Sequence, residues 1–234
     1  MSKKSLLSVL AIISLSGLVS CGGGAKYSKL QGSTMGTYYS ITYGEGDSCS
    51  PQKKAVDNLL AHINSVMSTY EPDSELSLIN QNLQAGEYAI SQELHLVLGA
   101  SLMVWQETRG AFDITIGPLV NLWGFGPTNA EETPTEFEQD AVAERIGMEN
   151  LELASNSIVK KQPNLFIDLS AIAKGYAVDR VAEKLSSLGC KDYLVDIGGE
   201  SFAKGQNQAG TPWKIGIEVP SPERRGIQRV LALS

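Results

Sequence analysis

The stretch from Ile167 to Asp179 carries an acidic and a basic side chain around the point where an apolar strand runs into a predicted helix. Asp168 stands just ahead of the helix, and Lys174 falls in its first turns. The first N–H groups of a helix lack partners within it, and their partial positive charge attracts anions such as phosphate. An acidic and a basic side chain at that position could bind a magnesium-bound pyrophosphate. Alternatively, Asp168 or Ser170 caps the helix and Lys174 is a surface lysine; the local pattern alone slightly favours capping.

A second candidate site lies in two glycine-rich segments that also contain aromatic residues, 110–115 and 121–126. Glycines allow the backbone to approach a flat ligand, and Phe112, Trp123 and Phe125 could stack on it. A packed aromatic loop with glycine turns explains the same pattern equally well.

Two further segments are weaker candidates. Ser68-Thr69-Tyr70 together with Ser74–Asn80 presents hydroxyl and amide groups, but the same residues could equally end one helix and cap a turn. Met35-Gly36-Thr37 opens a predicted strand, and by itself it is weak evidence for a site. These segments therefore need independent support before a function is assigned to them.

Several kinds of chemistry are excluded or poorly supported. The chain contains neither a GxxxxGK[ST] phosphate-binding loop nor a GxGxxG dinucleotide fingerprint. Its two histidines, His62 and His95, both fall in helical patterns, so histidine triads and histidine metal centres are poorly supported. A net charge of −7 argues against general binding of nucleic acid, because no basic surface is available in bulk.

The first residues predict export rather than fold. Lys3 and Lys4 form a short positive region, and residues 6–18 form an apolar one that suits a signal peptide but is too short to span a bilayer. Leu18-Val19-Ser20-Cys21 resembles the lipobox of bacterial lipoproteins; the alternative is an ordinary signal peptide with a chance cysteine. We expect a signal peptide at 1–20, a lipidated Cys21, a tether at 21–27 and one folded domain at 28–234.

Two cysteines remain in the domain, Cys49 and Cys190. They could pair in an oxidising compartment, but the sequence does not say whether they come close together, and we expect two unpaired cysteines. No Cys-x-x-Cys pair or cysteine–histidine cluster occurs in the sequence, so a structural zinc site is not expected.

The elements that must position these residues alternate between strands and helices. Apolar or alternating runs predict strands at 35–43, 165–169, 193–197 and 213–219. Helical periods predict helices at 55–67, after a capping Ser91, around Ala141 and at 170–188. Residues 110–127 read as a turn-rich loop and 128–140 as a polar connector. The predicted class is α+β with a mixed sheet and interleaved helices, and no boundary between two domains is evident.

Taken together, these segments resemble the ApbE family, the FAD:protein FMN transferases. The matching motifs occur in order along nearly all of the mature chain: Met35-Gly36-Thr37, Ser68–Asn80, Gly110–Thr115 with Asn121–Gly126, Asp168–Asp179 and Leu194–Glu200. The resemblance implies an ApbE-like fold and a Mg²⁺-dependent transferase. Such an enzyme cleaves the pyrophosphate of FAD, attaches FMN to a threonine of a partner protein through a phosphoester, and releases AMP.

The resemblance also implies roles for individual residues. The positions that match FAD contacts of the family are Met35, Tyr70, Ala111, Phe112, Asp113, Asp168 and Lys174. Residues 111–113 match the stretch that lines the adenine or flavin part, and we expect Asp168 to be catalytic as well. Ala171 matches a position that gives Mg²⁺ an oxygen, which here must come from the backbone carbonyl.

Partners and a location follow from the same resemblance. The usual acceptors in the family are subunits of redox-driven ion pumps, whose flavin domains face the same side of the membrane as a lipid-anchored enzyme. We therefore expect the protein on the periplasmic side of the cell inner membrane, held there by the lipid on Cys21, with no nucleic-acid partner.

One feature departs from the family pattern. Members continue past the strand at 213–219 into a portion with acidic and threonine ligands for magnesium, whereas this sequence stops at Ser234 without it. We therefore expect the domain to lack its C-terminal part and its metal site to be incomplete: either the chain is a truncated fragment, or its activity is reduced or lost. The alternative function is a periplasmic lipoprotein that binds FAD without turnover, and a third is a structural lipoprotein without a ligand.

Overall fold

The computed structural model describes residues 26–46, 49–126, 133–221 and 226–233. The predicted signal peptide, Cys21 and most of the tether lie outside the described residues, as does the start of the predicted polar connector. Tyr27, the last residue expected in the tether, is instead the first residue of a strand. In the described part of the chain, no helix combines the length and apolar character that a membrane crossing needs.

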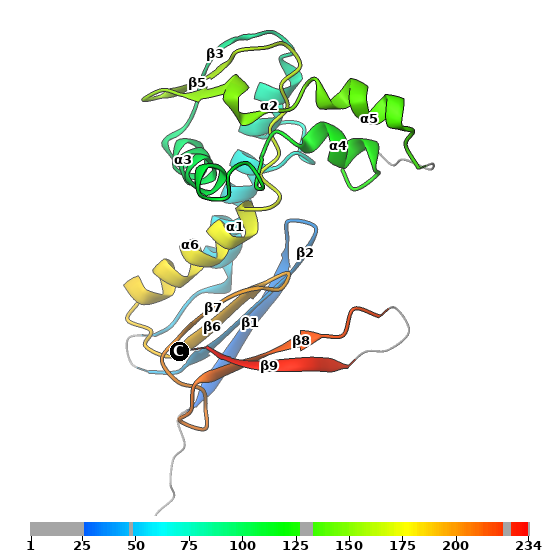
Figure 1. The fold of residues 1–234 in the computed structure, drawn as a ribbon. Helices are drawn as coiled ribbons and strands as arrows, with labels where there is room; N and C mark the ends of the chain where they lie inside the picture. Colours follow the sequence, from blue (N-terminus) through cyan, green and yellow to red (C-terminus); the bar gives the residue numbers. More distant parts are fainter. Residues whose placement is uncertain (1–25, 47–48, 127–132, 222–225, 234) are drawn as a thin grey trace, which may run out of the picture.

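A four-stranded antiparallel sheet forms the base of the fold, with strand order β1-β2-β6-β7 (Figure 1). Its strands are β1 (Tyr27–Thr34), β2 (Thr37–Gly44), β6 (Tyr193–Ile197) and β7 (Glu200–Lys204). The prediction for 193–197 is confirmed, whereas the strand predicted at 35–43 begins only at Thr37. Met35 and Gly36 form the two-residue turn before it, with φ of 50° and 69°, because a tight hairpin needs left-handed residues there.

Two long helices cover one face of this sheet. They are α1 (Lys53–Met67) and α6 (Ala173–Ser187), which pack against each other and against β1, β6 and β7 (Figure 1). The apolar residues of α1 recur at helical spacing and are buried: Val56, Leu60, Ile63, Val66 and Met67. The helix predicted at 55–67 is thus confirmed, with two additional residues at its start.

A second layer of structure lies above these helices in Figure 1. A three-stranded antiparallel sheet with order β3-β5-β4 is formed by β3 (Gly86–Ala89), β4 (Leu151–Leu153) and β5 (Ser157–Lys160). The helices around it are α2 (Glu75–Gln81), α3 (Gln92–Glu107), α4 (Gly117–Leu122), α5 (Glu136–Ala143) and a 3₁₀ turn at Met148–Asn150. Ser91 caps α3 as predicted, accepting a hydrogen bond from the Leu94 N–H. Helix α4 lies inside the stretch 110–127, which was therefore wrongly predicted to be loop throughout.

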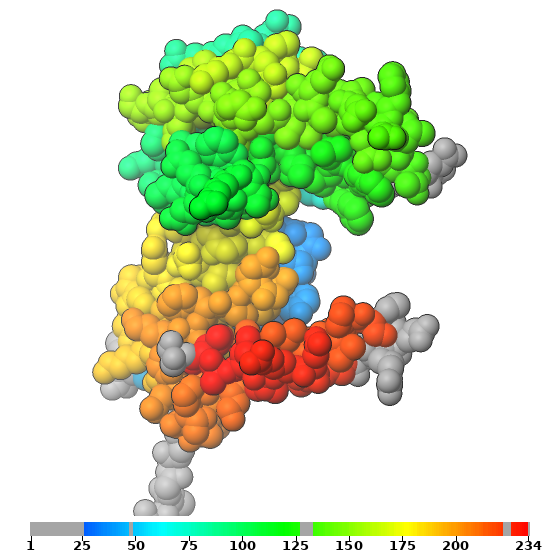
Figure 2. Space-filling model, viewed as in Figure 1, coloured from blue at the N-terminus to red at the C-terminus, as the bar shows by residue number. Residues whose placement is uncertain are grey.

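A third sheet is the two-stranded hairpin of β8 (Trp213–Glu218) and β9 (Ile227–Leu233). Strand β8 confirms the strand predicted from Trp213. The hairpin stands out from the body of the molecule in the space-filling view (Figure 2). The fold as a whole is α+β, with helices set against antiparallel sheets, in agreement with the predicted class.

The segment 165–172 differs from the prediction. Leu165, Ile167 and Leu169 are fully buried and alternate as in a strand, yet no strand of the described part of the chain pairs with them. The side chain of Asn80 pairs with Ile167 instead, through both its amide N–H and its carbonyl oxygen. Residues 170–172 form a turn, so α6 begins at Ala173 rather than at Ser170. Alternation of apolar and polar residues indicates which side chains are buried, but it does not indicate which groups bond the backbone N–H and carbonyl groups.

The expectation of two unpaired cysteines is wrong. Cys49 and Cys190 form a disulfide, and both are buried. Cys49 lies shortly before α1, and Cys190 shortly after α6. The antiparallel packing of these two helices brings the start of one next to the end of the other, a proximity that a sequence separation of 141 residues conceals.

Candidate active site

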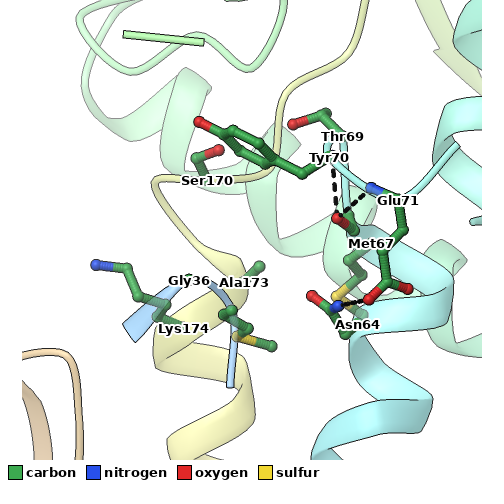
Figure 3. Close-up of a pocket in the computed structure, with 11 residues that line it drawn as sticks. Gly36, Asn64, Met67, Thr69, Tyr70, Glu71, Ser170, Ala173 and Lys174 are labelled. Carbon is green, nitrogen blue, oxygen red and sulfur yellow. Dashed lines mark hydrogen bonds between the residues drawn. The ribbon is translucent and has the colours of Figure 1, made fainter. Parts of the chain in front are cut away.

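A cavity of about 560 Å³ opens between the ends of the two long helices (Figure 3). Three segments far apart in the sequence line it: the β1–β2 turn, the end of α1 with the residues after it, and the start of α6. The lining residues are Met35, Gly36, Asn64, Met67, Ser68, Thr69, Tyr70, Glu71, Ser170, Ala173 and Lys174. The volume lies within the range of sites that bind cofactors and other small molecules.

The wall after α1 is a tight turn built on Ser68. The Ser68 hydroxyl oxygen accepts the N–H groups of Tyr70 and Glu71, at 3.0 Å each, so the chain turns sharply as α1 ends. The Glu71 carboxylate accepts a further hydrogen bond from the side-chain amide of Asn64. Tyr70 is 61% exposed and donates its hydroxyl to the carbonyl of Phe125, 3.1 Å away. The turn thereby presents an aromatic ring at the edge of the cavity.

The opposite wall is the start of α6. Ile172 is the N-cap residue, and it makes no side-chain capping bond. The first turn contains no acidic residue, so the positive end of the helix dipole is not offset by a neighbouring carboxylate of its own turn. Lys174 lines the cavity and forms an ion pair with Glu200 at the start of β7, with 2.8 Å between Nζ and Oε1. The N–H groups of Ile172 and Ala173 already bond the carbonyl of Leu169, so this wall offers the next N–H groups of the helix and one ammonium group to an anion.

Asp168 lies just before this wall and is half-buried. Its Oδ1 accepts the Ser170 N–H at 2.8 Å and also the Ser170 hydroxyl. Oδ2 has no hydrogen-bond partner among the residues that the structure describes. The carboxylate thus shapes the turn that leads into α6 through one oxygen and keeps the other available for a ligand.

The predicted residues 111–113 flank Asp168 rather than line the cavity. The Asp168 N–H donates to the carbonyl of Ile114 at 2.7 Å, which fixes the segment 110–115 beside residue 168. Asp113 folds back on its own segment, because its Oδ1 accepts the N–H and the hydroxyl of Thr115. Phe112 packs partly against the core, while Ala111 is exposed.

One carboxylate links the helices that carry the site. Glu93 at the start of α3 accepts the Tyr176 hydroxyl of α6 at 2.9 Å, and its Oε2 lies 2.7 Å from the Nε2 of His62 on α1. Burial, together with the hydrogen bond to Glu93, raises the pKa of Tyr176 to about 12, so this hydroxyl stays protonated. Both histidines lie on helices as predicted, and His95 bonds the carbonyl of Ala154 at 2.9 Å.

Comparison with known proteins agrees with this geometry. The sequence profile described as the ApbE family matches residues 35–234. The FAD:protein FMN transferase of Vibrio cholerae is 42% identical over 228 residues, which cover 95% of this chain and 68% of that protein. The chain belongs to the ApbE family. The Haemophilus influenzae FAD:protein FMN transferase is 39% identical over 245 residues, covering 99% of this chain and 70% of that protein.

A solved ApbE structure shares the fold. The flavin transferase ApbE from Vibrio cholerae superposes with a TM-score of 0.82 at 42% identity, covering 88% of this chain and 68% of that chain. The α+β architecture described above is therefore the ApbE fold.

The residues expected from the ApbE motifs fall into two groups. Met35, Tyr70 and Lys174 line the cavity. The others lie on the connected segments beside it: Ala111, Phe112, Asp113, Asp168 and Ala171, the last exposed in the turn before α6. The structure therefore brings the predicted residues to one region, although their individual roles stay predictions.

Some residues at this ApbE site were missed. Asn64 and Met67 line the cavity, but in the sequence they look like ordinary positions of an amphipathic helix. Glu200 was named only as the last residue of the Leu194–Glu200 motif, and its ion pair with Lys174 depends on the strand pairing of β6 with β7. The Ser68 turn, in contrast, was a candidate from the sequence, because it opens a hydroxyl-rich stretch from Ser68 to Ser77.

Proposed function

We propose that the protein is a Mg²⁺-dependent FAD:protein FMN transferase that modifies a threonine of a partner protein. The observation that carries the proposal is Lys174 beside the start of α6, which no side chain caps, on the wall of a cavity large enough for a nucleotide. A diphosphate fits such a wall, because helix N–H groups and an ammonium group both favour negative charge. Membership of the ApbE family and two relatives named FAD:protein FMN transferase support it.

The reaction follows from the chemistry of a diphosphate. The threonine oxygen of the acceptor attacks the phosphorus of the FMN half, a new P–O bond forms, and the bond to the bridging oxygen breaks. The hydroxyl proton passes to solvent, and AMP leaves with the bridging oxygen. Catalysis of such a transfer rests on positioning and on stabilising charge around the phosphorus. Lys174 and the start of α6 would hold the diphosphate, and the Tyr70 ring at the edge would contact the nucleotide.

The residues near the start of α6 fit a magnesium ion. Mg²⁺ prefers oxygen ligands and commonly takes one or two carboxylates together with substrate phosphates. Asp168 offers an oxygen without a partner in the described structure, and Ala171 would offer its backbone carbonyl. Among the described residues no group of three or more His, Cys, Asp or Glu side chains could hold a metal. The substrate phosphates would add further oxygen ligands, and the ion would neutralise negative charge on the diphosphate and on the phosphate of the departing AMP.

The proposed location is the periplasmic side of the inner membrane, with the lipid on Cys21 as the anchor. The disulfide between Cys49 and Cys190 supports an oxidising compartment, since disulfides are rare in the cytosol. The proposed acceptors are flavin-carrying subunits of redox-driven ion pumps that expose a threonine on the same side of the membrane.

The test uses the protein with FAD, Mg²⁺ and an acceptor domain that carries the threonine. We expect the acceptor to gain the mass of one FMN and AMP to appear in equal amount. An acceptor with that threonine replaced by valine is the control and should gain nothing. A folded protein that binds FAD and gives neither product would instead support the alternative, an FAD-binding lipoprotein without turnover.

A further inference from the structure

Helix α2 holds one wall of the cavity through Asn80. Asn80 is buried, and its side-chain amide donates to the carbonyl of Ile167 at 2.8 Å, while its Oδ1 accepts the Ile167 N–H at 2.9 Å. One side chain therefore satisfies both backbone groups of the residue that directly precedes Asp168. This is the pairing that a neighbouring strand would otherwise provide.

The same helix holds the opposite wall through its first turn. The hydroxyls of Ser74 and Ser77 both donate to the carbonyl of Ser68, the residue on which the turn from Ser68 to Glu71 is built. Ser74 is also the N-cap of α2, because its oxygen accepts the Ser77 N–H at 3.0 Å. Both serines are buried, so these hydrogen bonds are shielded from water.

The far end of α2 is fixed as well. Lys160 of β5 is buried and donates to the carbonyl of Asn82, at 2.6 Å, at the end of the helix. The helix cannot move without breaking contacts at both ends, and it has only seven residues. It therefore acts as a short rigid spacer between the turn after α1 and the segment that leads into α6.

We propose that Asn80 is a positioning residue for the FAD site, with α2 setting the separation of the two cavity walls. Asn80 acts through Ile167: it fixes the backbone from which Asp168 turns toward Ser170 and α6. The inference rests on the proposed function, because it assumes that FAD binds between these walls. The inference gives the Ser74–Asn80 motif a role, which is to hold the two cavity walls at a fixed separation.

The first test compares Asn80→Ala with the unchanged protein. Without Asn80 the Ile167 N–H and carbonyl lose their partners, and the Asp168 segment can shift. We expect the Kd for FAD, measured by flavin fluorescence with EDTA so that no turnover occurs, to rise about tenfold. The control is Ile158→Ala, which removes a buried side chain of β5 away from the cavity. It should lower the thermal midpoint while leaving the Kd within about twofold.

A second variant distinguishes positioning from general stability. In Asn80→Asp the introduced carboxyl, when neutral, can donate to the Ile167 carbonyl and accept its N–H, as the amide does. When charged it can only accept, and it lies against a carbonyl oxygen. Burial raises the pKa of a carboxyl, so the ratio of N80D to unchanged Kd should fall from about tenfold at pH 8 toward one at pH 5.

Hydrogen exchange tests, without FAD, whether Asn80 holds the backbone around Ile167. Peptides covering residues 165–172 should exchange faster in N80A and not in I158A. The inference is overturned if exchange there is unchanged in N80A, or if N80A and N80D both bind FAD within twofold of the unchanged protein at pH 8. If the unchanged protein binds no FAD, the proposed function fails, and the exchange result alone then decides whether Asn80 holds the segment.

Discussion

Removal of the disulfide should destabilise the protein strongly and leave ligand binding unchanged. We consider the double variant Cys49→Ala, Cys190→Ala, with Cys21→Ser in every sample so that no third thiol or lipid is present. A disulfide restricts the unfolded chain, and the effect grows with the length of the loop that it closes. For a separation of 141 residues the chain-entropy relation gives about 5 kcal/mol, and measured losses of about 2–5 kcal/mol are typical.

Because the disulfide is far from the cavity, we expect the double variant to bind FAD with unchanged affinity. The disulfide joins the segment before α1 to the segment after α6, whereas the cavity lies at the end of α1 and the start of α6. Each helix has 15 residues, which corresponds to about 22 Å at 1.5 Å per residue. The cross-link and the cavity are therefore at opposite ends of the same helix pair.

The assay is urea unfolding followed by far-UV circular dichroism, with and without dithiothreitol. The unchanged protein should lose stability on reduction, whereas the double variant should have the same low midpoint with and without dithiothreitol. Thiols counted by mass spectrometry after alkylation confirm the redox state. Equal midpoints for the oxidised protein and the double variant would refute the stabilising role. A large change in the Kd for FAD at a temperature where both are folded would refute the separation of cross-link and cavity.

Three further predictions concern single side chains. Lys174→Met should raise the Kd for FAD about ten- to a hundredfold, because a hydrogen bond to a charged group contributes about 1.5–3 kcal/mol; an unchanged Kd in fluorescence titration would exclude a phosphate contact. Asp168→Ala should strongly reduce Mg²⁺-dependent AMP release while changing the thermal midpoint little. A large loss of both would indicate that Asp168 serves only to stabilise the turn through its hydrogen bonds to Ser170. Hydrogen bonds from Lys53 and Tyr39 hold the pKa of Asp57 below its usual 3.8. Its contribution to stability is complete above that pH and is lost as the pH falls through the lowered pKa. The gap in urea midpoint between the unchanged protein and Asp57→Asn should therefore narrow below about pH 4, and a gap that is independent of pH contradicts it.

Much of the fold could be predicted where burial is periodic. Helix α1 and strand β6 have one apolar face each, and their predicted bounds differ from the observed ones by two residues at most. The capping serine of α3 was recognised because an N-cap bond is local, between Ser91 and Leu94. Strand β1 was missed, since its residues YSKLQGST carry little apolar character and only pairing with β2 makes them a strand.

The errors concern interactions between distant residues. The segment 165–169 looks like a strand, but its hydrogen-bond partner is a side chain 87 residues earlier, Asn80. The disulfide likewise depends on how two helices pack, which no spacing of cysteines shows. At the site, the motifs identified Met35, Tyr70 and Lys174, whereas Asn64 and Glu200 contribute only through the tertiary arrangement.

The antiparallel packing of α1 and α6 also determines which groups can carry the affinity for a diphosphate. At the cavity the negative end of the α1 dipole lies beside the positive end of the α6 dipole, so the two fields partly cancel. The helix terminus alone would then attract an anion weakly. Lys174 remains as a full positive charge on the wall, and it is partly balanced by Glu200. Tight binding of FAD should therefore depend on Lys174 and on Mg²⁺ more than on the start of α6. We expect Lys174→Met to raise the Kd for FAD by a larger factor without Mg²⁺ than with it, because Lys174 is then the main positive charge facing the diphosphate.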